Sequence, residues 1–351
     1  MVTVSAPARR SGPGELVSDE ACQRAGPVMD TSDDALKVWA MDGPDSNSEE
    51  TDTRAGQYVW YLASTPRRPP AGLRTFNVGG PITDAEHASH RSAVELLERA
   101  LAKSPFAAFQ ERCMEFMRAT SDTLEAFKAG QSTTPLAPVI RSRFDDVLSS
   151  FRRFTDRTAH LVTQRYGSDS EVVRVLKQAM SHEFDNEFAY RFMCQLRNYS
   201  EHRGPPIARI RQASNLTPSG RVEYDFDVLF DSRKLLPDHD WHRYVRADLA
   251  EINGEFSAVV TVDALLQACG RVHCKALLAQ ETEIMAAATD IQALAGRIAT
   301  DDALGPVLLQ AKPSELAVRQ VTSPINFTAI RTDLGEVAEE ALRQAHELID
   351  G

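Results

Sequence analysis

The sequence predicts a mainly α fold: an antiparallel four-helix bundle with a small β-hairpin insertion and additional C-terminal helices. Two observations predict it. Between residues 84 and 204, apolar residues recur at steps of three and four, which is the period of a helix with one buried face. After residue 204 a short stretch alternates apolar and polar residues instead, which is the period of a β-strand.

Composition supports a soluble globular protein. The 351 residues include 39 Lys and Arg against 50 Asp and Glu, a net charge of −11, and 42% are hydrophobic. No apolar run approaches the length of a membrane-spanning helix, and the amino-terminal residues lack the apolar stretch of a secretory signal. We therefore expect a cytoplasmic protein without membrane contact. An acidic chain needs a locally basic surface to bind a polyanion.

The first 83 residues show little of the apolar periodicity that predicts helices or strands. Residues 1–55 contain eleven acidic and five basic residues and no sustained apolar period, which predicts a disordered acidic tail. Residues 56–83 hold two extended pieces, 58–62 and 75–78, on either side of a Pro-rich loop. These pieces are short enough that they form strands only if they pair with each other.

Four helices are expected in the bundle domain, residues 84–204. Thr83 and Glu86 have capping-box spacing, as do Ser168 and Glu171, so each pair marks a helix start. Gly130, Gly167 and Gly204 follow the apolar patterns and suit helix ends. The predicted helices are 84–103, 105–129, 138–166 and 168–204, the last with a break near Ser181.

The rest of the chain adds smaller elements. Residues 207–215 and 221–230 flank a turn sequence and predict a β-hairpin within 205–232. Helical periodicity returns at 241–252 and again at 263–299, which predicts further helices packed on the bundle within 233–303. The last part, 304–351, is expected to be an extended segment followed by a helix at 334–349.

The end of the fourth helix carries the residues with the clearest chemistry. Arg197, Asn198 and His202 fall on the face opposite the apolar arc, because each residue turns the helix by about 100°. An Arg can stabilise the negative charge of a phosphorane, and a His can exchange protons near neutral pH. An Asn can orient either group. These residue types are those that a ribonuclease without a metal or cofactor uses.

The six residues 197–202, RNYSEH, resemble the R-N-x-x-x-H motif of the HEPN superfamily, and the sequence from LRNYSEHRGPPI to RKLLPDHDWHRYVRADL is similar to that of bacterial HEPN-like proteins. The resemblance covers about residues 84–290. It implies a metal-independent endoribonuclease in which a 2′-hydroxyl attacks phosphorus, with Arg197, Asn198 and His202 as catalytic residues. It also implies RNA as substrate, a homodimer with a composite active site, and a role as a toxin or phage-defence effector opposed by an antitoxin or regulatory protein.

Local charge favours RNA binding near the same motif. Residues 190–221 contain six Arg and a single Glu, a local charge of +5 on a chain of −11. The expected substrate-binding residues are Arg191, Arg203, Arg209 and Arg211. The alternative is that these side chains lie along the bundle surface and pair with acids elsewhere.

Structural explanations of the motif remain open. Arg197 and Glu201 are four residues apart and can form an ordinary surface ion pair. His202 near a helix C-terminus is favoured by the helix dipole without any catalysis. Two competing functions follow: a non-catalytic HEPN-like module that binds RNA or protein, and a purely structural interaction protein.

Metal binding is not expected. His87 with His90 and His239 with His242 form H-x-x-H pairs, but neither has the spacing or the added Cys ligands of a zinc site. The five cysteines are odd in number and include no C-x-x-C pair. No metal or cofactor is therefore assigned to the candidate site.

Overall fold

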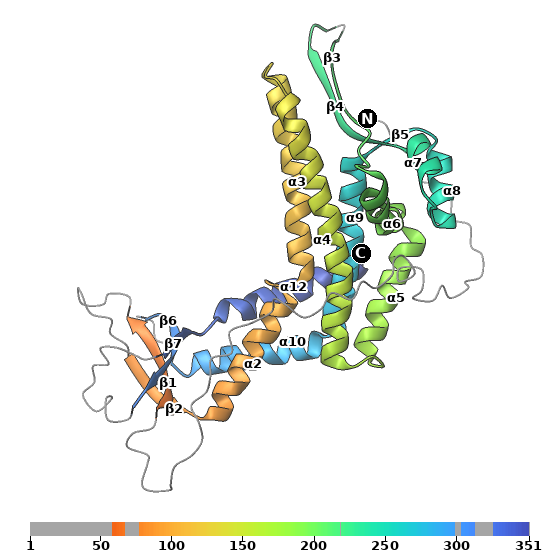
Figure 1. Cartoon of the computed structure of the whole chain (residues 1–351). Coiled ribbons are helices and arrows are strands. Elements are labelled where there is room, and N and C mark those ends of the chain that lie inside the picture. Colours follow the sequence, from red (N-terminus) through yellow and green to blue (C-terminus); the bar gives the residue numbers. More distant parts are fainter. Residues whose placement is uncertain (1–57, 67–76, 218, 299–302, 313–325, 351) are drawn as a thin grey trace. The chain divides into compact units, whose positions relative to one another are not determined.

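The computed structural model describes residues 58–66, 77–217, 219–298, 303–312 and 326–350. The protein is mainly helical, with small antiparallel sheets, as expected (Figure 1). The tail predicted over residues 1–55 lies outside the described residues. Among the described residues, no helix is both long enough and apolar enough to cross a membrane.

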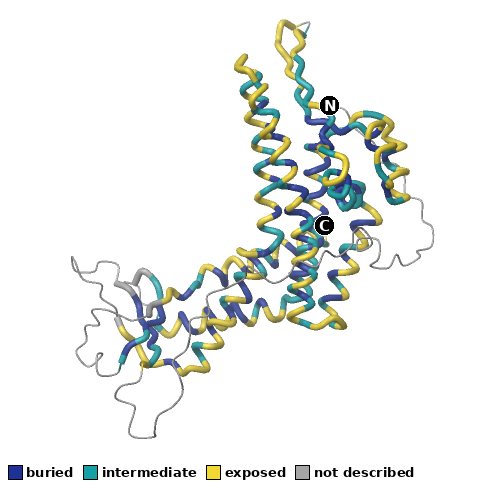
Figure 2. The backbone as a smooth tube through the Cα atoms, in the orientation of Figure 1, coloured by how far each residue is buried: buried dark blue, intermediate teal, exposed yellow. Residues whose placement is uncertain are grey.

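The larger core forms between long helices and is rich in phenylalanine. The helices that supply it are α3 (Pro105–Lys128), α4 (Ala137–Tyr166), α5 (Glu171–Asn186), α6 (Phe188–Arg203) and α9 (Ala258–Leu278). The predicted segments 105–129 and 138–166 match α3 and α4 closely, and the 3₁₀ turn η1 (Thr134–Leu136) joins them. Phe109, Phe116 and Phe144 are at most 1% exposed, so the apolar periodicity of the sequence does face this core (Figure 2).

Helix α2 (Asp84–Ala100) belongs to a different core from the one predicted for it. Its capping box is present as expected, with the Thr83 backbone N–H donating to Glu86 Oε2 at 2.7 Å. Its buried face, however, packs with α10 (Glu281–Gly296), α12 (Thr332–Asp350) and one sheet. The four predicted helices therefore divide between two cores. The larger core contains α9 in addition to α3, α4, α5 and α6.

The predicted fourth helix is two helices. Helix α5 ends at Asn186, Glu187 takes an extended conformation, and α6 begins at Phe188. A break was expected near Ser181, and it occurs six residues later. The N-cap of α5 is Ser170, whose hydroxyl accepts from the Val173 N–H at 3.3 Å, so the predicted capping box of Ser168 was wrong.

The strands form two sheets. In one, β1 (Val59–Pro66) pairs with β2 (Asn77–Ile82), as the sequence predicted, and also with β6 (Ala303–Ala311), which pairs with β7 (Asn326–Ala329). The strands β6 and β7 lie in the segment expected only to be extended. In the other, the predicted hairpin is β3 (Arg209–Leu216) and β4 (Val222–Asp231), and β5 (Glu255–Ser257) adds a third strand.

Two short helices follow the hairpin. Helix α7 (Ser232–Asp238) was not predicted, whereas α8 (Arg243–Ile252) matches the predicted segment 241–252 except for its first two residues. Between them, residues 239–242 form a connection that lies on α6, which we call the α7–α8 linker. The expected helix 263–299 begins earlier, at Ala258, and is interrupted at Ala279 and Gln280, which separate α9 from α10.

Candidate functional site

The last two turns of α6 carry the motif residues. Phe192, Met193, Leu196 and Tyr199 are buried on the core side, as the helical arc predicted. Arg197 and Asn198 are half-buried, whereas His202 is exposed. The helix ends at Gly204, whose φ of +114° is a conformation that L side chains rarely adopt, so His202 lies in the final turn.

Arg197 forms an ion pair with Glu201. Arg197 Nη2 lies 2.8 Å from Glu201 Oε1, and the two side chains are 39% and 50% exposed. A pair this exposed contributes about 0.2–1 kcal/mol to stability. The Arg197–Glu201 ion pair thus supports the structural explanation of the motif. It is weak enough that a phosphate could replace the Glu201 carboxylate as the partner of Arg197.

The α7–α8 linker is held against α6 by specific contacts. The backbone N–H of His242 donates to Gln195 Oε1 at 2.7 Å, and Trp241 stacks on Tyr199 with ring centroids 5.6 Å apart. Trp241 is 3% exposed, and its indole N–H donates to the Leu235 carbonyl at 2.8 Å. The linker therefore has a fixed position beside the end of α6.

This position brings a second histidine to the motif. The ring of His239 lies edge-on to Tyr199 at 6.0 Å and to Trp241 at 4.9 Å. Burial lowers the pKa of His239, although the nearby carboxylate of Asp240 acts in the opposite direction. The positive charges of Arg203 and His202 lower that pKa further, so both residues are electrostatic neighbours of His239.

Sequence reasoning missed the position of His239 near the motif. It was considered only with His242, as a metal-ligand pair, because the two share an H-x-x-H pattern. In the structure His242 is turned toward Phe184 and Tyr244, whereas His239 lies against Tyr199. No group of three or more potential metal ligands occurs among the described residues. The sequence did contain one indication of the position of His239. Trp241 is a large apolar residue in a polar stretch, and such a residue packs against the rest of the protein and fixes the residues around it.

Most of the predicted substrate-binding arginines have acidic partners. Arg191 is 13% exposed and binds both carboxylate oxygens of Asp248, with Nη2 to Oδ1 at 3.0 Å. The other two ion pairs join Arg209 Nη2 to Glu255 Oε2 at 2.6 Å and Arg211 Nε to Asp225 Oδ2 at 3.0 Å. The local positive excess of residues 190–221 is therefore largely cancelled by acids that follow residue 221.

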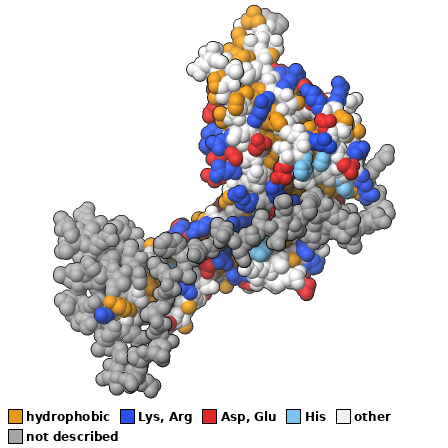
Figure 3. Space-filling view, in the orientation of Figure 1, with side chains coloured by type: hydrophobic (Ala, Val, Ile, Leu, Met, Phe, Trp, Pro, Cys, Tyr) orange, Lys and Arg blue, Asp and Glu red, His pale blue; other side chains and the backbone are white. Residues whose placement is uncertain are grey.

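Arg203 differs from these three. Its side chain is exposed, and it forms no ion pair with any residue that the structure describes. On the face drawn in Figure 3, basic and acidic side chains are interspersed over the helical part instead of forming one basic patch. Local basic character at the candidate site thus depends on Arg197 and Arg203 rather than on a broad surface.

The resulting site contains two imidazoles, two guanidinium groups and one amide. His202, Asn198, Arg197 and Arg203 come from α6, and His239 comes from the α7–α8 linker. Such a set can move two protons and stabilise one negative charge. A comparison of the chain with protein-family models, curated proteins and solved structures finds no match. The chemistry of the site therefore carries the functional argument.

Proposed function

We propose that this protein is a metal-independent endoribonuclease of HEPN type, with its active site at the end of α6. The observation that carries the proposal is the position of the His239 ring against Tyr199, which lies on α6 three residues before His202; the charges of Arg203 and His202 also lower the pKa of His239. Transesterification of RNA needs one group to accept a proton and another to donate one, and two neighbouring imidazoles supply both.

The reaction assigns one task to each group. His239, whose lowered pKa favours the neutral form, accepts the proton of the ribose 2′-hydroxyl. The 2′-oxygen forms a bond to phosphorus, and the bond from phosphorus to the 5′-oxygen breaks. His202 in its protonated form donates a proton to that 5′-oxygen. The products are a 2′,3′-cyclic phosphate and a 5′-hydroxyl, and no metal takes part.

The remaining motif residues stabilise and orient the reacting phosphate. Arg197 exchanges Glu201 for a phosphate oxygen and offsets the charge that develops on the phosphorane, an effect worth about 10²–10³ in rate. Asn198 orients the phosphate or the attacking hydroxyl. Arg203 contacts a neighbouring phosphate. Arg191, Arg209 and Arg211 take part in RNA binding only if they release their carboxylates.

The experiment is RNA cleavage in excess EDTA. We expect His202→Ala to reduce the rate by about 10²–10⁴ and His239→Asn to do the same. The matched control is His160→Ala, because His160 is exposed on α4 and has no hydrogen bond or ring contact among the described residues. Full activity of His202→Ala, or a strict need for a divalent ion, would contradict the mechanism.

The proposal includes a homodimer with a composite active site. A two-fold axis at the end of α6 would bring two copies of Arg197 and of His202 into one cleft. Mixing Arg197→Ala chains with His202→Ala chains tests this: recovered activity supports the composite site. A protein that is monomeric by light scattering and still active on RNA would rule out the homodimer, and His239 would then be the second proton-transfer group. Action as a toxin or phage-defence effector, held in check by an antitoxin or regulatory protein, belongs to the same proposal.

The Arg197–Glu201 ion pair favours a second candidate function, a non-catalytic module that binds RNA or a protein partner. In that case the motif stabilises the end of α6 and cleaves nothing. Binding of RNA by wild-type protein without any cleavage product, together with unchanged binding by His202→Ala, would support this candidate over the first.

A further inference from the structure

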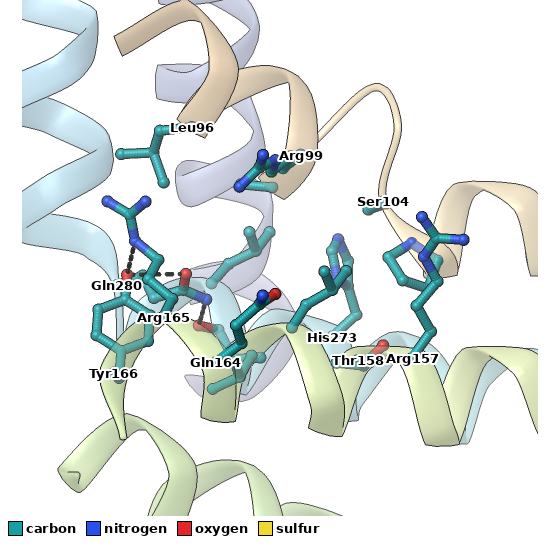
Figure 4. A pocket seen from close by; sticks show the side chains of 16 residues that line it. Leu96, Arg99, Ser104, Arg157, Thr158, Gln164, Arg165, Tyr166, His273 and Gln280 are labelled. Atoms are coloured by element: carbon teal, nitrogen blue, oxygen red, sulfur yellow. Dashed lines mark hydrogen bonds between the residues drawn. The ribbon is translucent and has the colours of Figure 1, made fainter. Parts of the chain in front are cut away.

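A separate cavity of about 480 Å³ lies within the helical part of the chain, among helices α2, α3, α4 and α9 and the turn that leads to α10 (Figure 4). This volume falls within the range of about 300–1,000 Å³ that small-molecule sites occupy. None of the motif residues of α6 lines it. It is therefore distinct from the proposed ribonuclease site.

The polar lining of the cavity is basic. Arg99 from α2 and both Arg157 and Arg165 from α4 line it, and no Asp or Glu is found among its described lining residues. Arg165 forms an ion pair with Glu283, with Nη2 and Oε2 2.7 Å apart, and Arg99 forms an ion pair with Glu95. Arg157 is exposed and forms no ion pair with any residue that the structure describes. The guanidinium of Arg157, unpaired among the described residues, and two further arginines whose glutamates lie outside the lining indicate an anionic ligand.

A buried hydroxyl in the lining also lacks a partner. Thr158 lines the cavity and is 8% exposed, and its Oγ1 is buried below the cavity surface without a hydrogen-bond partner among the described residues. Burying an unpaired hydroxyl costs free energy, so such groups usually have a partner. Ser104 and Pro105, at the amino terminus of α3, line the same cavity and add the positive end of a 24-residue helix.

The other lining residues suit an organic body rather than a bare ion. Leu96, Leu161 and Leu277 supply apolar surface. Gln164 and Gln280 supply amide groups that can recognise polar edges. His273 also lines the cavity, and burial lowers its pKa to about 4, so its imidazole is neutral at pH 7 and adds no charge.

We propose that this cavity binds a phosphate monoester with an organic body of the size of a nucleoside or sugar. The phosphate takes two hydrogen bonds from Arg157 and, once rotation about χ1 turns the Thr158 hydroxyl toward the cavity, one from Thr158, while Arg99 and Arg165 contribute charge to the extent that they release their glutamates. The organic body lies against the leucines. This inference does not depend on RNA cleavage at α6.

Thermal shift and calorimetry with defined probes test the proposal. The probes are AMP, glucose 6-phosphate, adenosine and glucose, each added to the full chain. We expect at least one phosphorylated probe to raise the Tm, and its unphosphorylated counterpart to have no effect. AMP and glucose 6-phosphate distinguish a nucleotide from a sugar phosphate as the preferred class. Equal shifts by phosphorylated and unphosphorylated probes, or no shift by any probe, would overturn the proposal.

Variants assign the effect to the cavity. Arg157→Gln should weaken binding about tenfold or more, as expected for loss of a charged hydrogen bond. The control is Arg153→Gln, one turn earlier on α4 and exposed, but outside the cavity lining. Equal affinity of the two variants would overturn the assignment.

Thr158→Val provides a second variant that keeps the shape of the side chain. It should raise the Tm of the free protein, because it removes a buried unpaired hydroxyl, and weaken binding of the phosphorylated probe. Unchanged binding by this variant would contradict the role of Thr158. His202→Ala, which tests the ribonuclease, should bind the probe as wild-type protein does, so failure of one proposal is distinguishable from failure of the other.

Discussion

The end of α6 and the contact between α5 and α9 both contain an Arg–Glu ion pair, but the two pairs lie in different surroundings. At the end of α6, Arg197 and Glu201 are 39% and 50% exposed. Between α5 and α9, Arg271 binds both oxygens of Glu183, at 2.9 and 2.6 Å, and the Glu183 side chain is 3% exposed. The two arginines are similarly exposed, Arg197 at 39% and Arg271 at 30%, so burial of the glutamate is what separates an arginine available for a ligand from one that holds two helices together.

The largest difference should appear when the two glutamates are neutralised. Glu183→Gln leaves Arg271 without its buried carboxylate and should lower the free energy of unfolding by about 3–5 kcal/mol. Urea denaturation measures the effect, and the m-value should stay unchanged. If the loss is below about 1 kcal/mol, Glu187, which lies 3.2 Å from Arg271, is a sufficient replacement and the comparison fails.

Lowering the pH should destabilise the region around the Arg271–Glu183 pair. His273 lies two residues after Arg271 on α9, and burial lowers its pKa from 6.5 to about 4. The unfolded chain therefore binds more protons than the folded chain between these values, and stability falls as pH decreases from about 6.5 to 4. A shift of this size corresponds to about 3 kcal/mol. The free energy of unfolding of His273→Gln, measured by urea at several pH values, should decrease less steeply than that of wild-type protein.

Arg191 and Arg203 sharpen the comparison within α6 itself. Arg191→Gln should cost about 2 kcal/mol of stability, because it breaks a bidentate pair of which only 13% of the Arg side chain is exposed. Arg203→Gln should change stability by less than about 0.5 kcal/mol. RNA binding should respond in the opposite order. Arg203→Gln should reduce the slope of log affinity against log salt concentration by about 1, as expected for the loss of one phosphate contact, whereas Arg191→Gln should leave the slope unchanged. The reverse order in either measurement would show that exposure does not separate the two roles.

The smallest effect is expected at Glu201. Glu201→Gln removes only an exposed i,i+4 pair, so the free energy of unfolding should change by less than about 0.5 kcal/mol. Cleavage of RNA should stay the same or rise slightly, because Arg197 no longer has to exchange a carboxylate for phosphate. A strong loss of cleavage would instead assign Glu201 a task in the reaction.

Much of the fold is predictable from local sequence. Apolar periodicity and helix caps depend only on residues within the same helix, so they are visible in the sequence. Examples are the Thr83–Glu86 capping box of α2, the phenylalanines of α3 and of α4, and Gly204 at the end of α6. The position of α2 is not, because its apolar face is equally suited to either core. The choice depends on α10 (Glu281–Gly296) and α12 (Thr332–Asp350), which both lie far from α2 in the sequence.

The candidate site was predictable only in part. The face of Arg197 and His202 followed from helical geometry, and the structure keeps both side chains accessible. The partners of Arg191 and Arg209 did not follow, because Asp248 and Glu255 are 57 and 46 residues away in the chain. His239 was missed for the same reason: its position depends on the packing of Trp241 against Tyr199.

The stacking of Trp241 gives the site an intrinsic optical signal. The chain has three tryptophans, and the indole of Trp241 contacts the rings of both Tyr199 and His239. Its fluorescence intensity will respond to protonation of the neighbouring imidazole, because imidazolium quenches an excited indole more strongly than imidazole does. Trp60 stacks on His87 and would respond in the same way, so a background in which Trp39 and Trp60 are both replaced by Phe isolates the signal of Trp241. Undocking of the linker from α6 would then be visible in real time, without any added label.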